Sequence, residues 1–568
     1  MTEKSIERPA IESLQGQIAP LEWLLVFSSC ATLSILAVFW SWRHGALLNY
    51  GDAVAHLHIA RRVFDCHQPR FSQLGSVWLP LPHILLLPFV QVYSWWADGL
   101  AGVFPSALAY LAACAGIYRL ARRWLPAQTA ALALAFFATN PNLLYLQTTA
   151  MTEPLFVCEM IWLAVWLVEW HAGLDDEKRR SNQRLWLIAL VLFAAVFTRY
   201  DGWVMALLAW TGIGLTLAKR GELGSRAFWL ASVLVVAAPV FWLVYNAAAF
   251  GDWLYFVRGP YSAAAIEMHT SVPGFPPHPG WHSPWVAFLF YMKAVELDSA
   301  AAAWGNTLLA LGLIGAACAG LSARHGAIGW TLLLALPIPF YAYSVAFGSV
   351  PIFLPVWWPH SWYNLRYGIE VLPALALSLA FVAQLAISLF PRAGLKPRWA
   401  SYAAALCFML IAINALQMLR ERPAVYVEGT SNIKAHRPYE EQIPAALKGL
   451  LARHPGAVIL IDTSVDPEIV ALTGIPLRQT INESDLEVYR NALAAPAAHA
   501  QIVLTYAGDE VDGAVKAHPE GLTEYRRFSA PLQPEVTLYV SDTLDASPAG
   551  FTLTRPAAAV IASLQELR

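Results

Sequence analysis

The feature of this sequence that most restricts its fold is a series of long apolar runs. Each run has close to 20 residues, with few or no charged side chains among them. A helix of about 20 apolar residues crosses a hydrocarbon core of roughly 30 Å. Only 13% of all residues are charged, against about 25% in an ordinary soluble protein. We therefore expect a polytopic α-helical membrane protein.

About eleven runs have the length and polarity of a transmembrane helix. They lie near residues 21–41, 101–118, 128–144, 155–170, 185–198, 203–218, 227–246, 302–321, 328–346, 369–390 and 400–418. A further run from Trp78 to Val92 contains three prolines, which interrupt a regular helix. Counting it as a crossing would also move every later basic loop to the opposite side. We expect this run to be interfacial or partly embedded.

The basic residues predict the orientation of these helices. Clusters of Lys and Arg follow every second run, as Arg119, Arg122 and Arg123; Lys178, Arg179, Arg180 and Arg184; Lys219, Arg220 and Arg226; Arg324; and Arg392, Lys396 and Arg398. Cytoplasmic loops carry an excess of Lys and Arg. The N-terminus is therefore predicted to be cytoplasmic and the chain after residue 417 extracytoplasmic. High Ala and Arg usage with few Lys favours a bacterial inner membrane.

Beyond Arg420 the apolar runs shorten to the length of β-strands. They lie at Val458 to Asp462, Ile502 to Tyr506 and Thr537 to Val540, with helical patterns between them. This alternation is typical of an α/β domain. We expect a transmembrane domain over residues 1–420 and a small soluble extracytoplasmic, here periplasmic, α/β domain over 421–568.

Composition also argues against a nucleic-acid-binding protein, and it identifies no specific metal site. The net charge is −2, and no Lys/Arg block with interleaved aromatic residues is present, so no nucleic-acid partner is expected. Five of the six cysteines lie in apolar runs, and no CxxC or Cys/His ligand spacing occurs. No metal site can be named from the sequence.

The first loop between apolar runs opens with an expected interfacial helix that carries Asp52 near its start. One interpretation is structural, because Asp is among the best N-cap residues. The other is chemical: Asp52 is a general base at the membrane surface, and His56 lies one helical turn along on the same face.

Three stretches of the chain carry a resemblance to a known family. They are Gly51-Asp52 with His56 to Arg62; Trp78-Leu79-Pro80-Leu81-Pro82-His83; and Pro105-Ser106-Ala107-Leu108 running to Tyr118-Arg119-Leu120-Ala121-Arg122-Arg123. Together they resemble the GT-C glycosyltransferases that use polyprenyl-phosphate sugars, a group that contains protein O-mannosyltransferases and aminoarabinose transferases. The resemblance covers roughly residues 20 to 375.

The resemblance implies a catalytic role for two acidic residues. Asp52 would be the catalytic base of the first loop, although Ala53 stands where many family members have a second carboxylate, which weakens the case for a metal there. Glu153 would be the second acidic residue of the cavity and would orient the acceptor or help to hold a divalent cation. The structural alternative is that Thr152 caps the next helix and Pro154 begins it.

Other residues are candidates for binding the donor, each with a structural alternative. Arg199 and Asp201 would face the headgroup or close a tight turn. Arg366, beside Tyr363 and Tyr367, would bind phosphate or anchor the chain at the interface. Further candidates with weaker support are His56, His83 and Arg258, since lone interfacial polar residues are common.

The sequence therefore predicts a membrane glycosyltransferase. It would transfer a sugar from a polyprenyl-phosphate donor to a lipid, glycan or protein acceptor at the extracytoplasmic face, with inversion and with Asp52 as general base. The alternative is a transporter or flippase of lipid-linked glycans. A transporter should place ionisable residues near the bilayer midplane on broken helices, whereas the candidates here lie at the ends of apolar runs.

Overall fold

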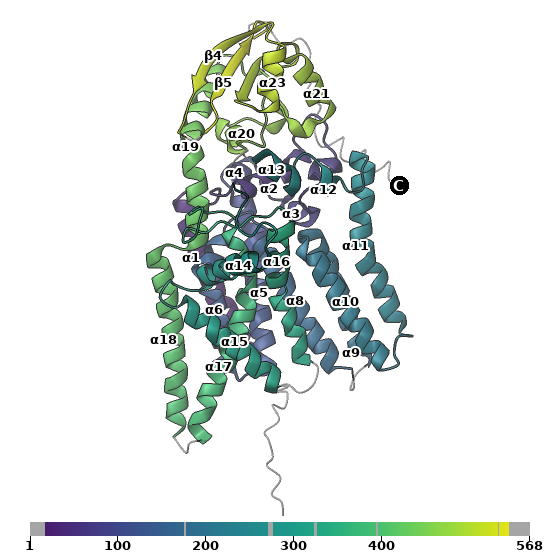
Figure 1. Cartoon of the computed structure of the whole chain (residues 1–568), viewed down its shortest axis with the longest axis vertical. Helices are drawn as coiled ribbons and strands as arrows, with labels where there is room; N and C mark the ends of the chain where they lie inside the picture. Colours follow the sequence, from purple (N-terminus) through teal and green to yellow (C-terminus); the bar gives the residue numbers. More distant parts are fainter. Residues whose placement is uncertain are drawn as a thin grey trace, which may run out of the picture. The chain divides into compact units, whose positions relative to one another are not determined.

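The computed structural model describes residues 18–174, 178–270, 276–322, 327–392, 396–531 and 533–544 (Figure 1). The chain forms two compact units, which we describe separately. The first contains Met1–Trp40, Ser106–Thr148 and Thr152–Glu428, and the second contains Ser41–Pro105, Thr149–Met151 and Gly429–Arg568. Arg324 and the chain before residue 18 lie outside the described residues, and so do the predictions made for them.

The first unit is built from helices. They are α1 (Pro20–Arg43), α5 (Leu100–Arg122), α6 (Ala127–Ala138), α7 (Pro141–Leu146), α8 (Glu153–Ala172), α9 (Lys178–Thr198), α10 (Asp201–Lys219), α11 (Arg226–Phe250), α12 (Tyr255–Arg258), α13 (Ala263–Thr270), α14 (Pro284–Ser299), α15 (Gly305–Ser322), α16 (Pro337–Phe347), α17 (Leu372–Arg392) and α18 (Pro397–Glu421). The 3-10 helices η2 (Ala327–Ala335) and η3 (Leu365–Val371) precede α16 and α17. Helix α19 (Ala424–Leu451) begins in this unit and continues into the second.

Nine helical segments among the described residues are long and apolar enough to cross a membrane. Two of the predicted runs form shorter helices, Ala127–Ala138 and Gly305–Gly320. The run predicted at 128–144 is divided because Asn140 caps α7 by accepting a hydrogen bond from the Leu143 amide, and Pro141 occupies the start of that helix. The polytopic helical fold class is confirmed, and the count of eleven crossings stays a prediction.

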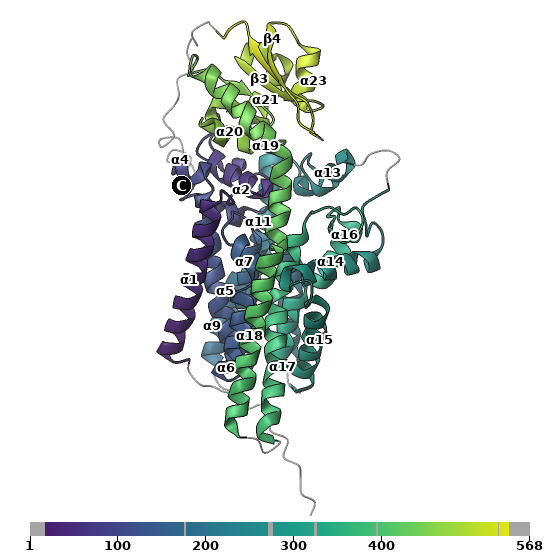
Figure 2. The same cartoon turned by 90° about the vertical axis from the view of Figure 1, so that its left-hand side faces the viewer.

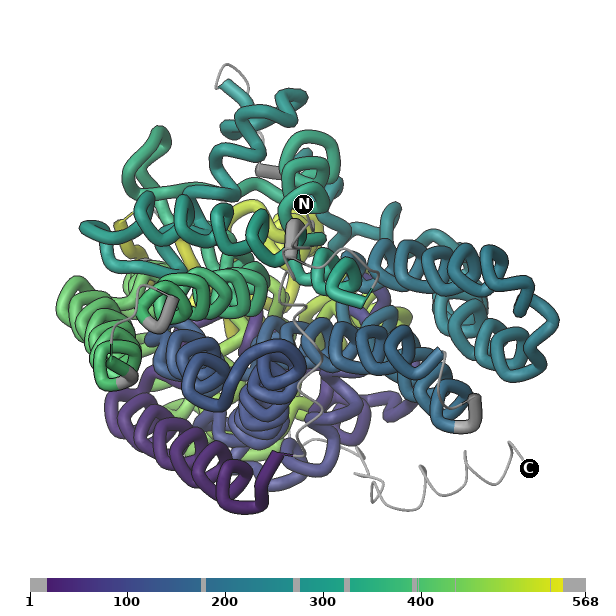
Figure 3. The backbone as a smooth tube through the Cα atoms, turned by 90° about the horizontal axis from the view of Figure 1, so that it is seen from below, coloured from purple at the N-terminus to yellow at the C-terminus, as the bar shows by residue number. Residues whose placement is uncertain are grey.

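The helices of the first unit pack in a layered arrangement with an apolar outer surface. Helix α8 packs on α9, which also contacts α10 and α11, and α17 lies beside α18 (Figures 1 and 2). Gly315 permits α15 to approach α17, since a Cβ atom there would lie 2.0 Å from the Ser378 carbonyl oxygen. Helix α1 lies at the rim of the unit (Figure 3), and its exposed leucines suit contact with lipid.

The second unit begins with the first loop, residues 44–99, which lies between α1 and α5. It contains α2 (Gly51–Arg62), η1 (Phe71–Leu74), α3 (Pro80–Leu86) and α4 (Tyr93–Ala97). The only regular helix at the start of the predicted interfacial run is α3, which has seven residues. A helix of this length cannot span a bilayer, in agreement with the prediction that the run is not a full crossing.

The C-terminal part of the second unit is a small α/β arrangement. Its strands are β1 (Ile459–Leu460), β2 (Thr480–Ile481), β3 (Ile502–Tyr506), β4 (Leu522–Phe528) and β5 (Val536–Ser541). Its short helices are α20 (Glu468–Thr473), α21 (Glu487–Ala494), α22 (Pro496–His499) and α23 (Glu510–Ala517), with the 3-10 turns η4 (Leu477–Gln479) and η5 (Glu483–Asp485). The strand order is β2-β1-β3-β5-β4. Strand β1 is parallel to β2 and β3, and β5 is antiparallel to β3 and β4.

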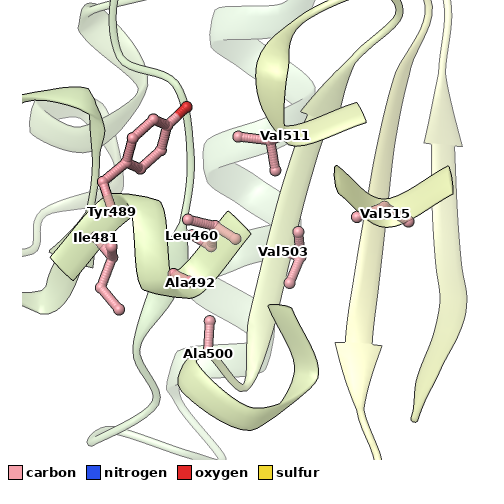
Figure 4. Packing of buried hydrophobic residues seen from close by; sticks show 8 residues of the cluster. All are labelled: Leu460, Ile481, Tyr489, Ala492, Ala500, Val503, Val511 and Val515. Atoms are coloured by element: carbon pink, nitrogen blue, oxygen red, sulfur yellow. The ribbon is translucent and has the colours of Figure 1, made fainter. Parts of the chain in front are cut away.

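The core of this sheet forms where helices cover its central strands. Leu460 and Val503 come from β1 and β3, and Tyr489 and Ala492 come from α21 (Figure 4). The three strands predicted from apolar runs are confirmed as β1, β3 and β5. Strand β2 has only two residues and β4 is polar and mostly exposed, so neither has an apolar run. The domain boundary at residue 420 stays a prediction, since the compact units follow contacts and not a membrane border.

Candidate active site

Arg199 lies in the turn between α9 and α10 and contacts five polar side chains, of which Glu153 is described below. Its Nη1 donates to Thr152 Oγ1 at 2.8 Å and its Nη2 to the Tyr341 hydroxyl at 2.6 Å. Carboxylate oxygens of Asp201 and Glu370 each lie 3.4 Å from the guanidinium. The local Arg/Asp pair predicted for this turn is present. It is one part of a larger cluster, because Arg199 also reaches α16, η3 and the start of α8.

Arg366, in η3, is bound by two further carboxylates. Its Nε lies 3.2 Å from Glu153 Oε1, and its Nη1 donates to Glu428 Oε1 at 2.9 Å. Its backbone amide also donates to Glu428 Oε2 at 3.2 Å. The side chain is only 4% exposed. An interfacial anchor extends its charged group toward water, so this alternative for Arg366 is wrong.

Glu153 and Tyr367 bring the two arginines together. Glu153 Oε1 lies 3.4 Å from Arg199 Nη1 and 3.2 Å from Arg366 Nε. Each guanidinium carbon lies 5.0 Å from the centre of the Tyr367 ring, a cation–π distance. The ring of Tyr367 also stacks on Tyr341 at 4.9 Å. Two cations therefore share one carboxylate oxygen and one aromatic ring.

We call this set of side chains the charge network. Its charged members are Arg199, Arg366, Glu153, Asp201, Glu370 and Glu428. The carboxylates exceed the guanidiniums, and every one of these acidic side chains is buried. Burial of an ion is unfavourable unless it is paired. Any movement that separates these pairs would leave a buried charge uncompensated, so the arginines stay in one arrangement. The network is a preorganised cluster in which four carboxylates hold two guanidiniums.

Asp298, at the end of α14, lies beside this cluster. Its carbonyl oxygen accepts hydrogen bonds from Asn140 at 2.8 Å and from Asn142 at 3.0 Å. Its carboxyl group is completely buried. Burial, and then the negative charge of Glu428, raise the pKa of Asp298 well above its ordinary value. Burial therefore stabilises the neutral form of Asp298 relative to that of an exposed aspartate.

The start of α8 shows why Glu153 faces the network. Thr152 holds the N-cap position and Pro154 lies in the first turn, as the structural interpretation predicted. The Thr152 side chain makes no capping hydrogen bond, because its oxygen accepts from Arg199. The structural interpretation therefore holds, because this stretch begins the helix. It also directs Glu153 and Thr152 toward the arginines, while a role of Glu153 toward the acceptor stays a prediction.

Asp52 and His56 lie on α2 of the second unit. Tyr50 holds the N-cap position of α2, and Asp52 lies in the first turn, half-buried. The interpretation of Asp52 as the N-cap is therefore wrong, although a carboxylate in a first turn is still stabilised by the helix dipole. His56 lies one turn further along and is buried. Helix α2 thus carries both residues, one helical turn apart.

The two predicted histidines of the first loop are hydrogen-bonded to each other. His56 Nδ1 lies 2.8 Å from His83 Nε2, and the His56 ring lies 4.6 Å from that of Trp78. One nitrogen must donate and the other accept, which requires at least one neutral ring. Burial of His83, followed by the charges of His56 and Arg62, lowers the pKa of His83 well below its usual value.

Two predicted residues have other surroundings. Arg258 pairs with Asp252 at 3.6 Å and is 61% exposed. Tyr363 pairs with Phe353 in an isolated antiparallel bridge and is 41% exposed. Neither placement resembles the buried charge network.

Sequence reasoning missed several members of the network. Glu370 follows Arg366 at helical spacing, which was a usable signal. Tyr341 and Glu428 gave no such signal. Tyr341 lies inside an apolar run, and Glu428 lies beyond the predicted membrane domain. Among the described residues, no three or more His, Cys, Asp or Glu side chains are grouped so as to hold a metal ion. The divalent cation considered for Glu153 therefore has no fitting ligand set in this part of the chain.

Comparison with known proteins agrees with this architecture. The chain is similar to the crystal structure of ArnT from Cupriavidus metallidurans bound to undecaprenyl phosphate, with 13% identity, a TM-score of 0.53, and coverage of 94% of this chain and 100% of that one. It is also similar to an Archaeoglobus fulgidus oligosaccharyltransferase in complex with Zn and sulfate, with 11% identity, a TM-score of 0.45, and coverage of 91% and 73%. No curated protein sequence matches the chain. The ArnT likeness, together with the apolar helices, defines an integral membrane protein with the GT-C fold.

Part of the chain also matches the sequence model of a protein family. Residues 96–245 match the model described as dolichyl-phosphate-mannose-protein mannosyltransferase. This match over residues 96–245 and the fold together support membership of the GT-C glycosyltransferase superfamily. The matched stretch contains Glu153, Arg199 and Asp201, which are three members of the charge network.

Proposed function

We propose that this chain is a membrane glycosyltransferase that transfers a sugar from a polyprenyl-phosphate donor to a lipid, glycan or protein acceptor. The observation that carries the proposal is the pair of buried guanidiniums of Arg199 and Arg366 over the ring of Tyr367. Guanidinium groups bind phosphate oxygens through paired, charge-assisted hydrogen bonds. The undecaprenyl phosphate named with the similar ArnT structure supports the same class of donor here.

In this proposal the arginines stabilise the leaving group. The acceptor oxygen or nitrogen forms a bond to the anomeric carbon as the bond from that carbon to the phosphate oxygen breaks. The electron pair leaves with the polyprenyl phosphate, and two fixed cations stabilise its growing negative charge. Asp52 takes the proton of the acceptor as general base. A single displacement of this kind inverts the configuration of the sugar.

We assign Glu153 a positioning role within this mechanism. A general base needs a carboxylate that can accept a proton near the operating pH. Glu153 Oε1 lies 3.4 Å from Arg199 Nη1 and 3.2 Å from Arg366 Nε, so this oxygen is occupied by two ion pairs. Its contacts instead keep Arg199 and Arg366 at a fixed separation.

The alternative of a transporter or flippase has less support. Transported ions and substrates are bound near the bilayer midplane, at breaks in transmembrane helices. Glu153 and Asp201 are the first residues of α8 and α10, and Arg366 lies in the 3-10 helix before α17. Charges concentrated at helix ends favour a site at one face of the membrane.

We further propose that this face is periplasmic and the membrane is a bacterial inner membrane. The proposal rests on the basic clusters, which place the N-terminus in the cytoplasm. In whole cells, single cysteines introduced near Trp281 and in residues 430–540 should react with an impermeant maleimide, and one at Lys178 should not. Labelling of Lys178→Cys from outside would reverse the orientation.

The transfer itself is tested with purified full-length protein and a panel of polyprenyl-phosphate sugars. We expect release of free polyprenyl phosphate from at least one donor, even where water replaces the unknown acceptor as a slow nucleophile. The Asp52→Asn and Arg366→Ala variants are the matched inactive controls. Donor binding without release of polyprenyl phosphate, with extracts supplied as acceptor source, would favour the transporter.

A further inference from the structure

The first turn of α19 is fixed in the first unit by contacts of two kinds. The Val425 amide donates to Asn142 Oδ1 at 2.9 Å. The Tyr426 ring lies edge-on to Tyr145 at 5.2 Å and to Trp40 at 5.4 Å. These contacts place the next turn of the helix, and with it Glu428, against η3. Residues that follow the last predicted transmembrane run thus belong to the surroundings of the charge network.

Glu428 binds both the backbone amide and the guanidinium of Arg366. Its Oε1 accepts from Arg366 Nη1 at 2.9 Å, and its Oε2 accepts from the Arg366 backbone amide at 3.2 Å. Both side chains are buried, with Arg366 4% and Glu428 0% exposed. A carboxylate that bridges the backbone and the guanidinium of the same residue restricts the side-chain torsions between them. Glu428 therefore selects the conformation in which Arg366 also meets Glu153 and Tyr367.

This bridge needs two acceptor oxygens. Glutamine has the same shape but offers only one, and its amide group is a donor facing another donor. Aspartate keeps both oxygens and the charge, but its side chain is one methylene shorter. Glu428→Gln removes the charge and one acceptor oxygen, whereas Glu428→Asp keeps both and changes only the length of the side chain. The two variants therefore test charge and geometry separately.

From these contacts we propose that Glu428 is a positioning residue for donor binding, and that the helix leading to the C-terminal unit therefore completes the phosphate site. The inference rests on the proposed function, because it assigns phosphate recognition to Arg366. The segment after residue 420 then has a defined role, since it supplies the carboxylate that orients the phosphate-binding guanidinium.

The test is a double-mutant cycle on the binding of undecaprenyl phosphate to purified full-length protein, which needs no knowledge of the sugar or acceptor. The proteins are wild type, Glu428→Gln, Arg366→Lys and the double variant, with Glu428→Asp as a second probe of the bridge. Glu421→Gln is the matched control. Glu421 is the last residue of α18, and its carboxylate accepts a hydrogen bond from the exposed Ala302 amide.

We expect Glu428→Gln and Glu428→Asp to weaken binding about tenfold, and Arg366→Lys tenfold or more, on the scale of a charge-assisted hydrogen bond. The double variant should bind no more weakly than Arg366→Lys alone, because Glu428 acts through Arg366. Glu421→Gln should match wild type. A loss of about a hundredfold in the double variant, the product of two tenfold effects, would mean independent roles and overturn the inference.

Two other outcomes separate the inference from the proposed function. Tighter or unchanged binding by Glu428→Gln would mean that Glu428 competes with phosphate for Arg366 or is irrelevant to it, and the positioning role would be abandoned while the donor class stands. Wild-type protein that binds no undecaprenyl phosphate would overturn the donor class and the inference together.

Discussion

The charge network of the first unit and the first loop of the second unit place acidic residues in different surroundings. In the network, Glu153 is buried and lies near two guanidiniums. In the first loop, Asp52 is half-buried at the start of α2, one helical turn before His56, which is hydrogen-bonded to His83. A carboxylate fixed between cations is suited to orienting them, whereas one at an accessible helix start is suited to exchanging a proton. The comparison teaches that two acidic residues at helix starts can differ in burial, since Glu153 is fully buried beside two guanidiniums and Asp52 is half-buried.

The sharpest test of this comparison is Asp52→Asn. Loss of a general base should lower the rate of sugar transfer by about 10² to 10⁴ while the protein stays folded. Asparagine is close to aspartate in shape and is tolerated near a helix start, so a structural role predicts little change in turnover. The measurement is transfer rate at saturating donor. Asp98→Asn, an exposed carboxylate of the same loop, is the control and should keep normal turnover. Normal turnover in Asp52→Asn would remove it from the mechanism.

Arg366→Lys tests the other half of the comparison. Lysine keeps the charge but cannot bind Glu153, Glu428 and a phosphate with the planar geometry of guanidinium. We expect donor use, measured as the dependence of transfer on donor concentration, to weaken about tenfold or more, which is roughly 1.4 kcal/mol. Arg437→Lys is the control, since Arg437 is exposed and pairs with Glu441 on the surface of α19. Equal donor dependence in Arg366→Lys and wild type would move the phosphate site to Arg199.

The buried histidines predict that the first loop is sensitive to acid. Burial, and then the charge of Arg62, lower the pKa of His58 on α2 to about 3, against about 6.5 in an unfolded chain. The unfolded state therefore binds a proton at His58 that the folded state does not. The contribution of neutral His58 to the free energy of unfolding is fully present above about pH 6.5 and is lost as the pH falls. At about pH 5.5 the loss from His58 is about 1.4 kcal/mol.

Amide hydrogen exchange of α2 at about pH 7.5 and about pH 5.5, corrected for the intrinsic rate, measures this loss as a change in opening free energy. His58→Phe keeps an aromatic ring beside Trp96, whose centre lies 5.2 Å from that of His58, but has no group to titrate. The variant should show a smaller decrease on acidification than wild type. Equal decreases in both proteins would rule out His58 as the source.

The smallest effect is expected from Arg478→Ala. In the second unit, Asp65 accepts from the Arg478 amide at 3.4 Å, and His67 Nε2 lies 3.0 Å from the Thr480 carbonyl oxygen, so the first loop rests on the η4 and β2 region. The Arg478 side chain is 3.9 Å from Asp65 and about one third exposed, so it should contribute less than about 1 kcal/mol. Hydrogen exchange at the end of α2 should rise slightly, by less than about fivefold. A larger rise would show that the C-terminal segment is essential to the order of the loop.

The sequence alone determined the helical membrane fold, because runs of apolar residues must form helices in lipid wherever they occur in the chain. It also identified Arg199, Asp201, Arg366 and Glu153, since polar residues at the ends of apolar runs stand out. It could not pair them, because Arg366 meets Glu153 across more than two hundred residues and Glu428 across sixty-two. Such contacts depend on how helices pack.

The tertiary structure excluded one alternative at two positions, Arg366 and Asp52. Arg366 is a buried partner of two carboxylates and not an interfacial anchor, and Asp52 follows the N-cap and does not occupy it. The same residue types at the same spacings were compatible with both outcomes, because local sequence fixes where a helix begins but not what its side chains meet. In this chain, burial gives the paired charges their preorganisation, and burial is a property of the packed helices alone.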